Sequence, residues 1–295
     1  MSVSTILLLL MVDLLWAANT IVSKLAVSNL GMPPLFYALL RSLLVLAALA
    51  PLLRPVPKHV GRVMLIGLAV GGGSFALLFM GLQSASPSAA GVVGLSGAPM
   101  TVLFAILFLG ERIHWKRASG IVLTFAGVLL AVSAEGDMRA SGGLALVFAS
   151  AVVGALGSVF FKKVEVSSIR LQVWAAVAST LVLTPLAFAL EPSPLAALSR
   201  APLELAGCLL FASVVVSVGA HGTYYRILQN NDANLVVPLT LLSPLFTIVL
   251  GGLVTGDHIG PRLLIGGTIA IAGVAIIVIR PSETFTKRFL VRSRL

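Results

Sequence analysis

The feature that most constrains this chain is a series of long apolar runs separated by short polar stretches. The hydrocarbon core of a bilayer is about 30 Å thick, and roughly 20 helical residues cross it. Ten runs of that length follow one another in the sequence. They lie at 6–27, 33–53, 63–82, 90–109, 118–134, 142–161, 171–190, 205–225, 233–254 and 263–279. The sequence therefore predicts an all-α integral membrane protein with ten transmembrane helices.

Composition excludes a water-soluble globule. Of the 295 residues, 58% are hydrophobic and only 10% are charged, whereas soluble domains carry about 25% charged residues. The polar side chains are too few to cover a surface that faces water, so most of the surface must face lipid. The first run has no basic stretch before it and continues to Lys24, so we expect a retained helix rather than a cleaved signal peptide.

Basic residues gather in alternate loops and predict the orientation of the chain. The formal net charge is +10, and cytoplasmic loops retain an excess of Lys and Arg. With the N-terminus placed inside, the outer stretches contain only Lys24, Arg139, Arg200 and Arg262. We predict a multi-pass protein of the cell inner (plasma) membrane with both termini cytoplasmic. The basic tail, 281–295, is expected to contact anionic lipid rather than nucleic acid.

The sequence shows no arrangement suited to covalent or metal chemistry. The single cysteine, Cys208, excludes an intramolecular disulfide, and the four histidines lack metal-ligand spacing. No Gly-x-x-x-x-Gly-Lys phosphate loop, paired-acid site or interfacial His/Glu pair is present. We therefore expect no catalytic residue, no cofactor and no metal. A membrane enzyme is disfavoured, and ATP is not expected as an energy source.

The two halves of the chain repeat the same landmarks. A proline, an acidic residue and two glycines follow one another at intervals of 12, 9 and 7 residues in the first half and 13, 9 and 7 in the second. These residues are Pro99, Glu111, Gly120 and Gly127, and Pro244, Asp257, Gly266 and Gly273. We predict five-helix units at 1–136 and 137–280. Because five is odd, the second unit is inverted, which suits alternating access. Glycines two turns apart favour helix packing.

At these residues the chain resembles the ten-helix EamA-type branch of the drug/metabolite transporter (DMT) superfamily. The resemblance extends over roughly residues 5 to 280 and includes WAANTIVSKLAV and LFYALLRSLL in the first half and HGTYYRILQ, LLSP and GDHI in the second. Gly154 departs from it as the repeat counterpart of the first-helix tryptophan, and Asp257 replaces the usual glutamate. The resemblance implies two inverted repeats that move amino acids, metabolites or toxic compounds.

Charged residues inside the apolar runs must have a structural or functional role, because a charge at membrane depth costs about 2.5–3.5 kcal/mol on insertion scales. Asp13 lies in the first run and Arg41 in the second. Three hypotheses remain open: pairing or hydrogen bonding between these helices, proton coupling through Asp13, and a helix end placed too deep. Lys24 and its repeat counterpart Lys162 end their helices at opposite mouths of the expected path, either as snorkelling side chains or as gates.

Two prolines and two acidic residues stand at matched positions. Pro99 and Pro244 lie within runs, and irregular backbone at that depth survives only where protein or a water-filled cavity covers it. They therefore either line a binding cavity or form structural kinks. Glu111 and Asp257 each follow a glycine, as acidic caps near a helix N-terminus or as gates. Hydroxyl groups near the prolines are those of Ser96, Thr101, Thr240 and Ser243.

Aromatic and polar residues in the other runs complete the candidate cavity. His221 could serve substrate or proton, whereas an interfacial belt explains Tyr224 equally well. We expect the first, third, fourth, sixth, eighth and ninth runs to line one central path, and the fifth and tenth to supply packing. The remaining cavity candidates are Trp16, Asn19, Phe75, Phe79 and Ser158.

These features together predict a secondary transporter that exports small metabolites by alternating access of two inverted repeats. Amino acids, especially larger neutral or aromatic ones, are the expected substrates. Efflux of drugs or toxic compounds by the same fold is one alternative, and a channel-like facilitator is another. The expected partners are a small-molecule substrate, the lipid bilayer and a proton as candidate counter-ion. The sequence leaves the physiological substrate, the coupling and the oligomeric state open.

Overall fold

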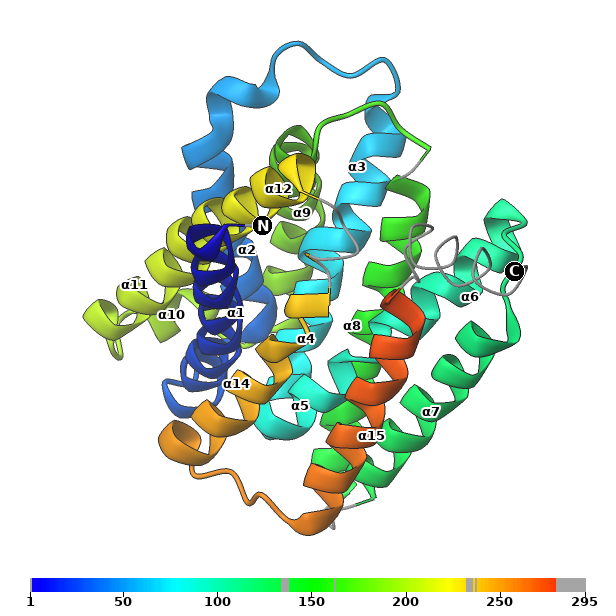
Figure 1. Ribbon diagram of the computed structural model, residues 1–295. Coiled ribbons are helices and arrows are strands. Elements are labelled where there is room, and N and C mark those ends of the chain that lie inside the picture. Colours follow the sequence, from blue (N-terminus) through cyan, green and yellow to red (C-terminus); the bar gives the residue numbers. More distant parts are fainter. Residues whose placement is uncertain (1, 134–137, 162, 232–235, 237, 280–295) are drawn as a thin grey trace, which may run out of the picture.

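The computed structural model describes residues 2–133, 138–161, 163–231, 236 and 238–279, and these residues form a bundle of helices without strands (Figure 1). The helices of the first half are α1 (Val3–Lys24), α2 (Pro34–Leu49), α3 (Val60–Leu68), α4 (Ser74–Leu82), α5 (Pro87–Gly94), α6 (Gly97–Leu109) and α7 (Trp115–Val132). Those of the second half are α8 (Met138–Phe161), α9 (Ser168–Leu190), α10 (Pro194–Leu198), α11 (Pro202–Leu210), α12 (His221–Asn230), α14 (Leu242–Leu250) and α15 (Pro261–Val278).

Nine helical stretches of the described residues are long and apolar enough to cross a membrane. They are Val3–Asn29, Pro34–Leu53, Val60–Leu82, Pro87–Leu109, Trp115–Val132, Ala140–Phe161, Ser168–Leu190, Pro202–Leu228 and Pro261–Val278. A shorter apolar helix covers Leu242–Thr255 and overlaps the run predicted at 233–254. Of that run, residues 233–235 and 237 lie outside the described residues. The prediction of an all-α integral membrane fold is confirmed.

The two spans that carry the matched prolines Pro99 and Pro244 are interrupted, whereas Pro185 lies inside the continuous helix α9. α5 ends at Gly94 and α6 begins at Gly97. In the second half, a turn at Thr240 and Leu241 precedes α14. Pro99 and Pro244 are each the third residue of the helix after the interruption, where a missing N–H costs no intrahelical hydrogen bond. The prolines therefore stand in a first helical turn rather than in the middle of a continuous helix.

The third and eighth spans each contain a π-helical segment, at corresponding places in the two halves. Ala69–Gly73 joins α3 to α4, and Phe211–Ala220 joins α11 to α12. Gly71, with φ −110° and ψ −109°, interrupts regular helical geometry in the first segment. Such π-helical segments frequently occur at functional sites.

α7 and α15 lie side by side (Figure 1) and bring the two halves together through glycines. A Cβ atom on Gly127 would lie 2.5 Å from the carbonyl oxygen of Gly266, and one on Gly120 would lie 2.8 Å from that of Gly273. The two backbones approach this closely because each helix has glycines at the crossing. The interpretation of these glycines as packing positions is confirmed.

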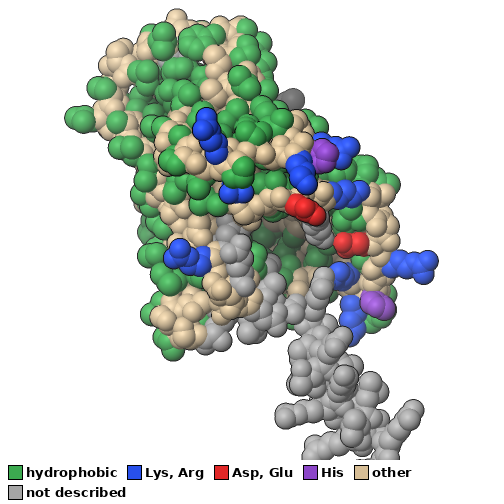
Figure 2. Space-filling view, turned by 90° about the horizontal axis from the view of Figure 1, so that it is seen from above, with side chains coloured by type: hydrophobic (Ala, Val, Ile, Leu, Met, Phe, Trp, Pro, Cys, Tyr) green, Lys and Arg blue, Asp and Glu red, His purple; other side chains and the backbone are tan. Residues whose placement is uncertain are grey.

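Basic side chains gather at one end of the bundle, which we call the basic end, and Figure 2 views this face directly. It carries the loops at 54–59, 110–114 and 163–167. A recess opens in the same face (Figure 2). The described basic residues at this end are Arg54, Lys58, Arg62, Arg112, Lys116, Arg117, Lys163, Arg170 and Arg226.

The opposite end is held by carboxylates that cap helices distant in sequence. The N–H of Leu35 donates to Glu191 Oε1 at 2.7 Å, and the N–H of Phe36 donates to Oε2 at 2.8 Å, so that Glu191 caps α2. Partial burial raises the pKa of Glu191, and the two backbone N–H groups oppose that rise. Asp257 Oδ2 accepts the N–H of Ser88 at 2.8 Å. Asp257 is therefore a helix cap, as the sequence suggests, but it caps α5 from the other half.

Candidate functional site

A central cavity of about 310 Å³ lies between the two halves. Its walls come from the first, third, fourth, sixth, eighth and ninth spans, the six that the sequence analysis expects around a path. The lining residues are Trp16, Asn19, Thr20, Phe75, Leu78, Ala90, Gly91, Gly94, Val147, Ser150, Ala151, Val216, His221, Ser243, Pro244 and Thr247. Its volume falls within the range of ligand pockets, about 300–1,000 Å³.

One side of α1 carries buried polar atoms that lack partners among the described residues. Both carboxylate oxygens of Asp13, the indole Nε1 of Trp16 and the amide oxygen of Asn19 make no hydrogen bond there. These side chains follow one another at intervals of three and share one side of the helix. An unpartnered buried polar group is costly. Trp16 and Asn19, which line the central cavity, are therefore suited to contact water or a polar substrate group, whereas Asp13 is not among the lining residues of this cavity or of its neighbour.

Aromatic rings meet where α1 faces the eighth span. The ring centroids of Trp16 and His221 are 5.3 Å apart, and those of Trp16 and Tyr224 are 5.1 Å apart. The Nδ1 of His221 lies 2.9 Å from the carbonyl oxygen of Val216. Because a carbonyl oxygen only accepts, Nδ1 donates this bond, and Nε2 of the neutral ring remains an acceptor. The cavity wall thus combines flat apolar surfaces with a polar ring edge.

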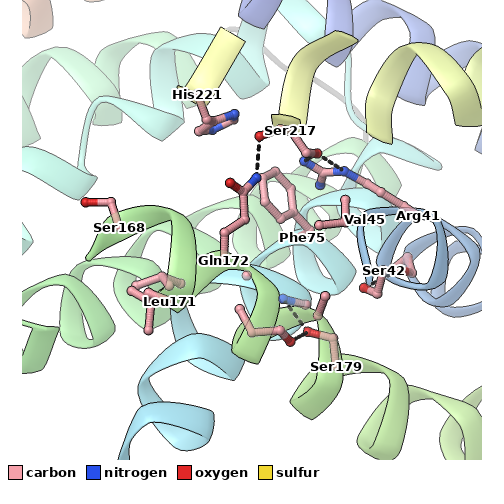
Figure 3. A pocket seen from close by; sticks show the side chains of 16 residues that line it. Arg41, Ser42, Val45, Phe75, Ser168, Leu171, Gln172, Ser179, Ser217 and His221 are labelled. Atoms are coloured by element: carbon pink, nitrogen blue, oxygen red, sulfur yellow. Dashed lines mark hydrogen bonds between the residues drawn. The ribbon is translucent and has the colours of Figure 1, made fainter. Parts of the chain in front are cut away.

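A second cavity of about 150 Å³ adjoins the first and contains the Arg41 guanidinium (Figure 3). We call it the Arg41 chamber. Phe75 and His221 line both cavities, so these two side chains form the boundary between them. Its lining residues are Ala38, Arg41, Ser42, Val45, Val70, Gly71, Gly72, Phe75, Ser168, Leu171, Gln172, Ala175, Ala176, Ser179, Ser217 and His221.

The hypothesis that Asp13 pairs with Arg41 is wrong for the described structure. Arg41 donates from Nη2 to Ser217 Oγ at 2.8 Å and from Nε to the same oxygen at 3.1 Å. Neither carboxylate oxygen of Asp13 has a hydrogen-bond partner there. Asp13 is fully buried. Its depth in the membrane and proton coupling through its carboxylate both stay predictions.

Several predicted candidates lie outside the described lining of the central cavity. Thr101 and Ser158 donate their hydroxyls at 2.8 Å to carbonyls of their own helices, the local bond expected of hydroxyls in membrane helices. Ser96, between α5 and α6, donates to the carbonyl of Val93 in α5 at 2.7 Å. Ser158 is exposed on α8. Phe79 and Pro99 are buried, and Phe79 packs edge-on against Tyr37 with centroids 4.9 Å apart.

The remaining predicted positions lie near span ends. Lys24 Nζ donates to the carbonyl oxygen of Gln83 at 3.4 Å and so contacts the end of α4. Thr240 lies at the turn before α14 and has an interaction partner. Lys162, the counterpart of Lys24, lies outside the described residues. Gating by these residues stays a prediction.

Sequence reasoning missed the polar residues of the Arg41 chamber. Gln172 and Ser179 lie in the seventh predicted run and Ser217 in the eighth. Gln172 donates its side-chain N–H to the carbonyl oxygen of Ser217, and Ser179 Oγ accepts the N–H of Gly72 at 3.0 Å. A lone glutamine in an apolar run was the available signal, because a polar side chain at membrane depth needs a partner. In the part of the chain that the structure describes, no group of three His, Cys, Asp or Glu residues could hold a metal.

Apolar spans, matched interruptions and a central cavity with few polar groups define a membrane transporter rather than an enzyme. Residues 3–133 and 141–279 each match the sequence model of the EamA-like transporter family, and the chain belongs to that family. The resemblance to the DMT superfamily is thereby confirmed.

Relatives and a solved structure agree with this assignment. The chain is 28% identical over 281 residues to the "Probable amino-acid metabolite efflux pump" of Escherichia coli (strain K12), covering 91% of this chain and 93% of the relative. It is 26% identical over 228 residues to the "Probable terminal-alkyne amino-acid exporter" of Streptantibioticus cattleyicolor, covering 76% and 75%. A solved crystal structure aligns over 99% of both chains with a TM-score of 0.60 and 21% identity, which shows the fold alone.

Proposed function

We propose that the protein is a secondary transporter that exports small metabolites, with larger neutral or aromatic amino acids as the substrate class. The observation that carries this proposal is the central cavity, which Trp16, Phe75 and His221 line together with Asn19, whose amide oxygen has no hydrogen-bond partner among the described residues. Aromatic walls suit an apolar side chain, and a few polar groups suit a small charged or polar head. Two relatives named for amino-acid export support the same class.

The proposed transport cycle moves the two repeats, 1–136 and 137–280, against each other around this cavity. The close glycine contact between α7 and α15 joins the repeats away from the cavity and is a suitable pivot. The caps that Glu191 and Asp257 place on α2 and α5 would hold the end opposite the basic end closed. Opening toward that end then requires both caps to separate from their helices.

Coupling to a proton is assigned in this proposal to Asp13. Its carboxylate is fully buried and has no hydrogen-bond partner among the described residues. A buried carboxyl that is protonated in one state of the cycle and ionised in another links proton movement to transport. In this proposal the protein lies in the inner (plasma) membrane. By the positive-inside rule, its basic end, both termini and the tail 281–295 then lie on the cytoplasmic side.

Counterflow in proteoliposomes tests the proposed function. Liposomes loaded with unlabelled L-phenylalanine should accumulate external labelled L-phenylalanine with saturable kinetics. Trp16→Ala should weaken this exchange by about tenfold, because it removes two ring contacts and a cavity wall. Trp115→Ala is the matched control, since Trp115 is exposed at the start of α7.

The alternatives predict different results in the same assay. A linear flux that internal substrate does not stimulate would indicate a channel-like facilitator. Exchange of organic drug cations without exchange of any amino acid would indicate drug efflux instead. Either result would overturn the proposed substrate class.

A further inference from the structure

Arg41 carries a buried positive charge that has no acidic hydrogen-bond partner among the described residues. The side chain is only 5% exposed, in the middle of a membrane span. Its hydrogen-bond partners among the described residues are the Ser217 hydroxyl and, at 3.4 Å, the carbonyl of Ala212, both of which are neutral. Charged side chains at membrane depth are costly and are usually paired or face a cavity. The negative partner of Arg41 is therefore to be sought in the cavity.

The surroundings hold the guanidinium in one orientation. Its central carbon lies 3.6 Å from the centroid of the Phe75 ring, which stacks on one face. Ser217 Oγ also donates to the carbonyl of Ala212 at 2.7 Å, so the π-helical segment positions the oxygen that receives Nε and Nη2. Nη1 makes no hydrogen bond to any described residue and remains a donor. A fixed, partly unused guanidinium edge matches the planar geometry of a carboxylate.

Neutral polar groups surround this edge. Figure 3 shows Gln172 and Phe75 beside the guanidinium, with the Gln172 amide bonded to the backbone of Ser217. Because the Gln172 nitrogen is engaged in that bond, its oxygen remains an acceptor for an N–H group. A molecule that carries an ammonium group next to a carboxylate would find a partner for each.

We propose that the Arg41 chamber binds the carboxylate of the transported molecule, while its side chain stays in the central cavity. The chamber holds about 150 Å³, against about 310 Å³ in the central cavity. Phe75 and His221 line both spaces, so a molecule that passes between them reaches Arg41 with one end. This assignment rests on the proposed function for the identity of the molecule, and it makes the carboxylate the group that the transporter recognises.

Ligands that differ only at the two head groups test the assignment on the unaltered protein. 3-Phenylpropionate, which keeps the carboxylate and lacks the amine, should inhibit L-phenylalanine counterflow. L-phenylalaninamide should inhibit it more weakly by roughly ten- to hundredfold, the range for a lost charge-assisted hydrogen bond. Equal inhibition by L-phenylalaninamide and L-phenylalanine would overturn the carboxylate site and leave the transport function standing.

A thiol-labelling experiment tests the site without requiring transport. Ser42 lines the chamber, and Ser42→Cys in a Cys208→Ala background places one thiol there. We compare the rate at which this thiol reacts with an anionic methanethiosulfonate to its rate with a cationic one. This anion-to-cation ratio should fall roughly tenfold when Arg41→Gln is added, because the substitution removes the local positive charge that attracts the anion. Ser150→Cys in the central cavity is the matched control and should show a smaller change. Arg41→Lys, which keeps the charge, should restore most of the ratio.

Protection of the Ser42→Cys thiol separates the remaining outcomes. Protection by 3-phenylpropionate but not by 2-phenylethylamine supports the carboxylate site. If that protection holds and no amino acid is exchanged, the proposed substrate class fails while the site stands. If neither compound protects and the rate ratio is unchanged by Arg41→Gln, the guanidinium only joins α2 to the eighth span. If Arg41→Gln does not fold, the protection of the Ser42→Cys thiol and the inhibition by L-phenylalaninamide still test the carboxylate site.

Discussion

Gly127→Ala is the substitution whose cost follows most directly from the structure. The new Cβ atom would lie 2.5 Å from the carbonyl oxygen of Gly266 and 2.9 Å from Cα of Ala270. Ordinary contacts begin near 3.4 Å, so α15 would have to retreat by about 1 Å over a contact that is backbone on both sides. Overpacking of this kind costs typically about 1–3 kcal/mol. Alanine itself favours helix by about 0.5–1 kcal/mol over glycine, which offsets part of that loss.

Gly142→Ala is the matched control, because a Cβ atom on Gly142, in α8, meets no atom within 4 Å. Thermal unfolding of the purified proteins in detergent, followed by tryptophan fluorescence, should show Gly127→Ala less stable than the unaltered protein. Gly142→Ala should be unchanged or slightly more stable. The double variant Gly127→Ala with Gly266→Ala should lose less stability than the sum of the losses in the two single variants, because the first substitution already separates the helices. Equal stability of Gly127→Ala and Gly142→Ala would refute the close α7–α15 contact.

Three further predictions concern coupling, capping and orientation. Asp13→Asn should keep counterflow, which needs no gradient, and lose stimulation by a pH gradient; full retention of that stimulation in a folded variant would remove proton coupling through Asp13. Asp257→Ala should lower the free energy of unfolding by about 0.5–2 kcal/mol through the lost cap on Ser88, and by more than Glu165→Ala at the exposed basic-end loop. A reporter fused to the C-terminus should be active in the cytoplasm, and activity only in the periplasm would contradict both the orientation and the inverted repeats.

Features that depend on local sequence could be predicted. The spans follow from apolar length, and the glycine contact follows from Gly120 and Gly127 recurring as Gly266 and Gly273. The interruptions near Pro99 and Pro244 follow from the chemistry of proline. Each of these signals lies within about one helix, where periodicity and turn geometry decide the structure.

Features that depend on how helices meet could not be predicted. Arg41 donates hydrogen bonds to Ser217, which is 176 positions away in sequence, rather than to Asp13 in the preceding helix. The π-helical segment that presents Ser217 has no residue signature as clear as proline. Asp257 caps α5 rather than the helix that follows it, and it stands directly after Gly256, whose φ of +68° ends the preceding helical segment. Side-chain direction at such contacts is set by packing between distant elements.

The proposed function requires that the central cavity opens alternately to the two sides of the membrane. Single cysteines in a Cys208→Ala background, labelled with an impermeant thiol reagent from each side of oriented vesicles, measure this most directly. Ser243→Cys, in the cavity wall, should react from both sides and be protected by L-phenylalanine, whereas Thr124→Cys, in the α7–α15 contact, should react from neither. Strong labelling of Thr124→Cys with an unreactive Ser243→Cys would contradict the account and place the path between other helices.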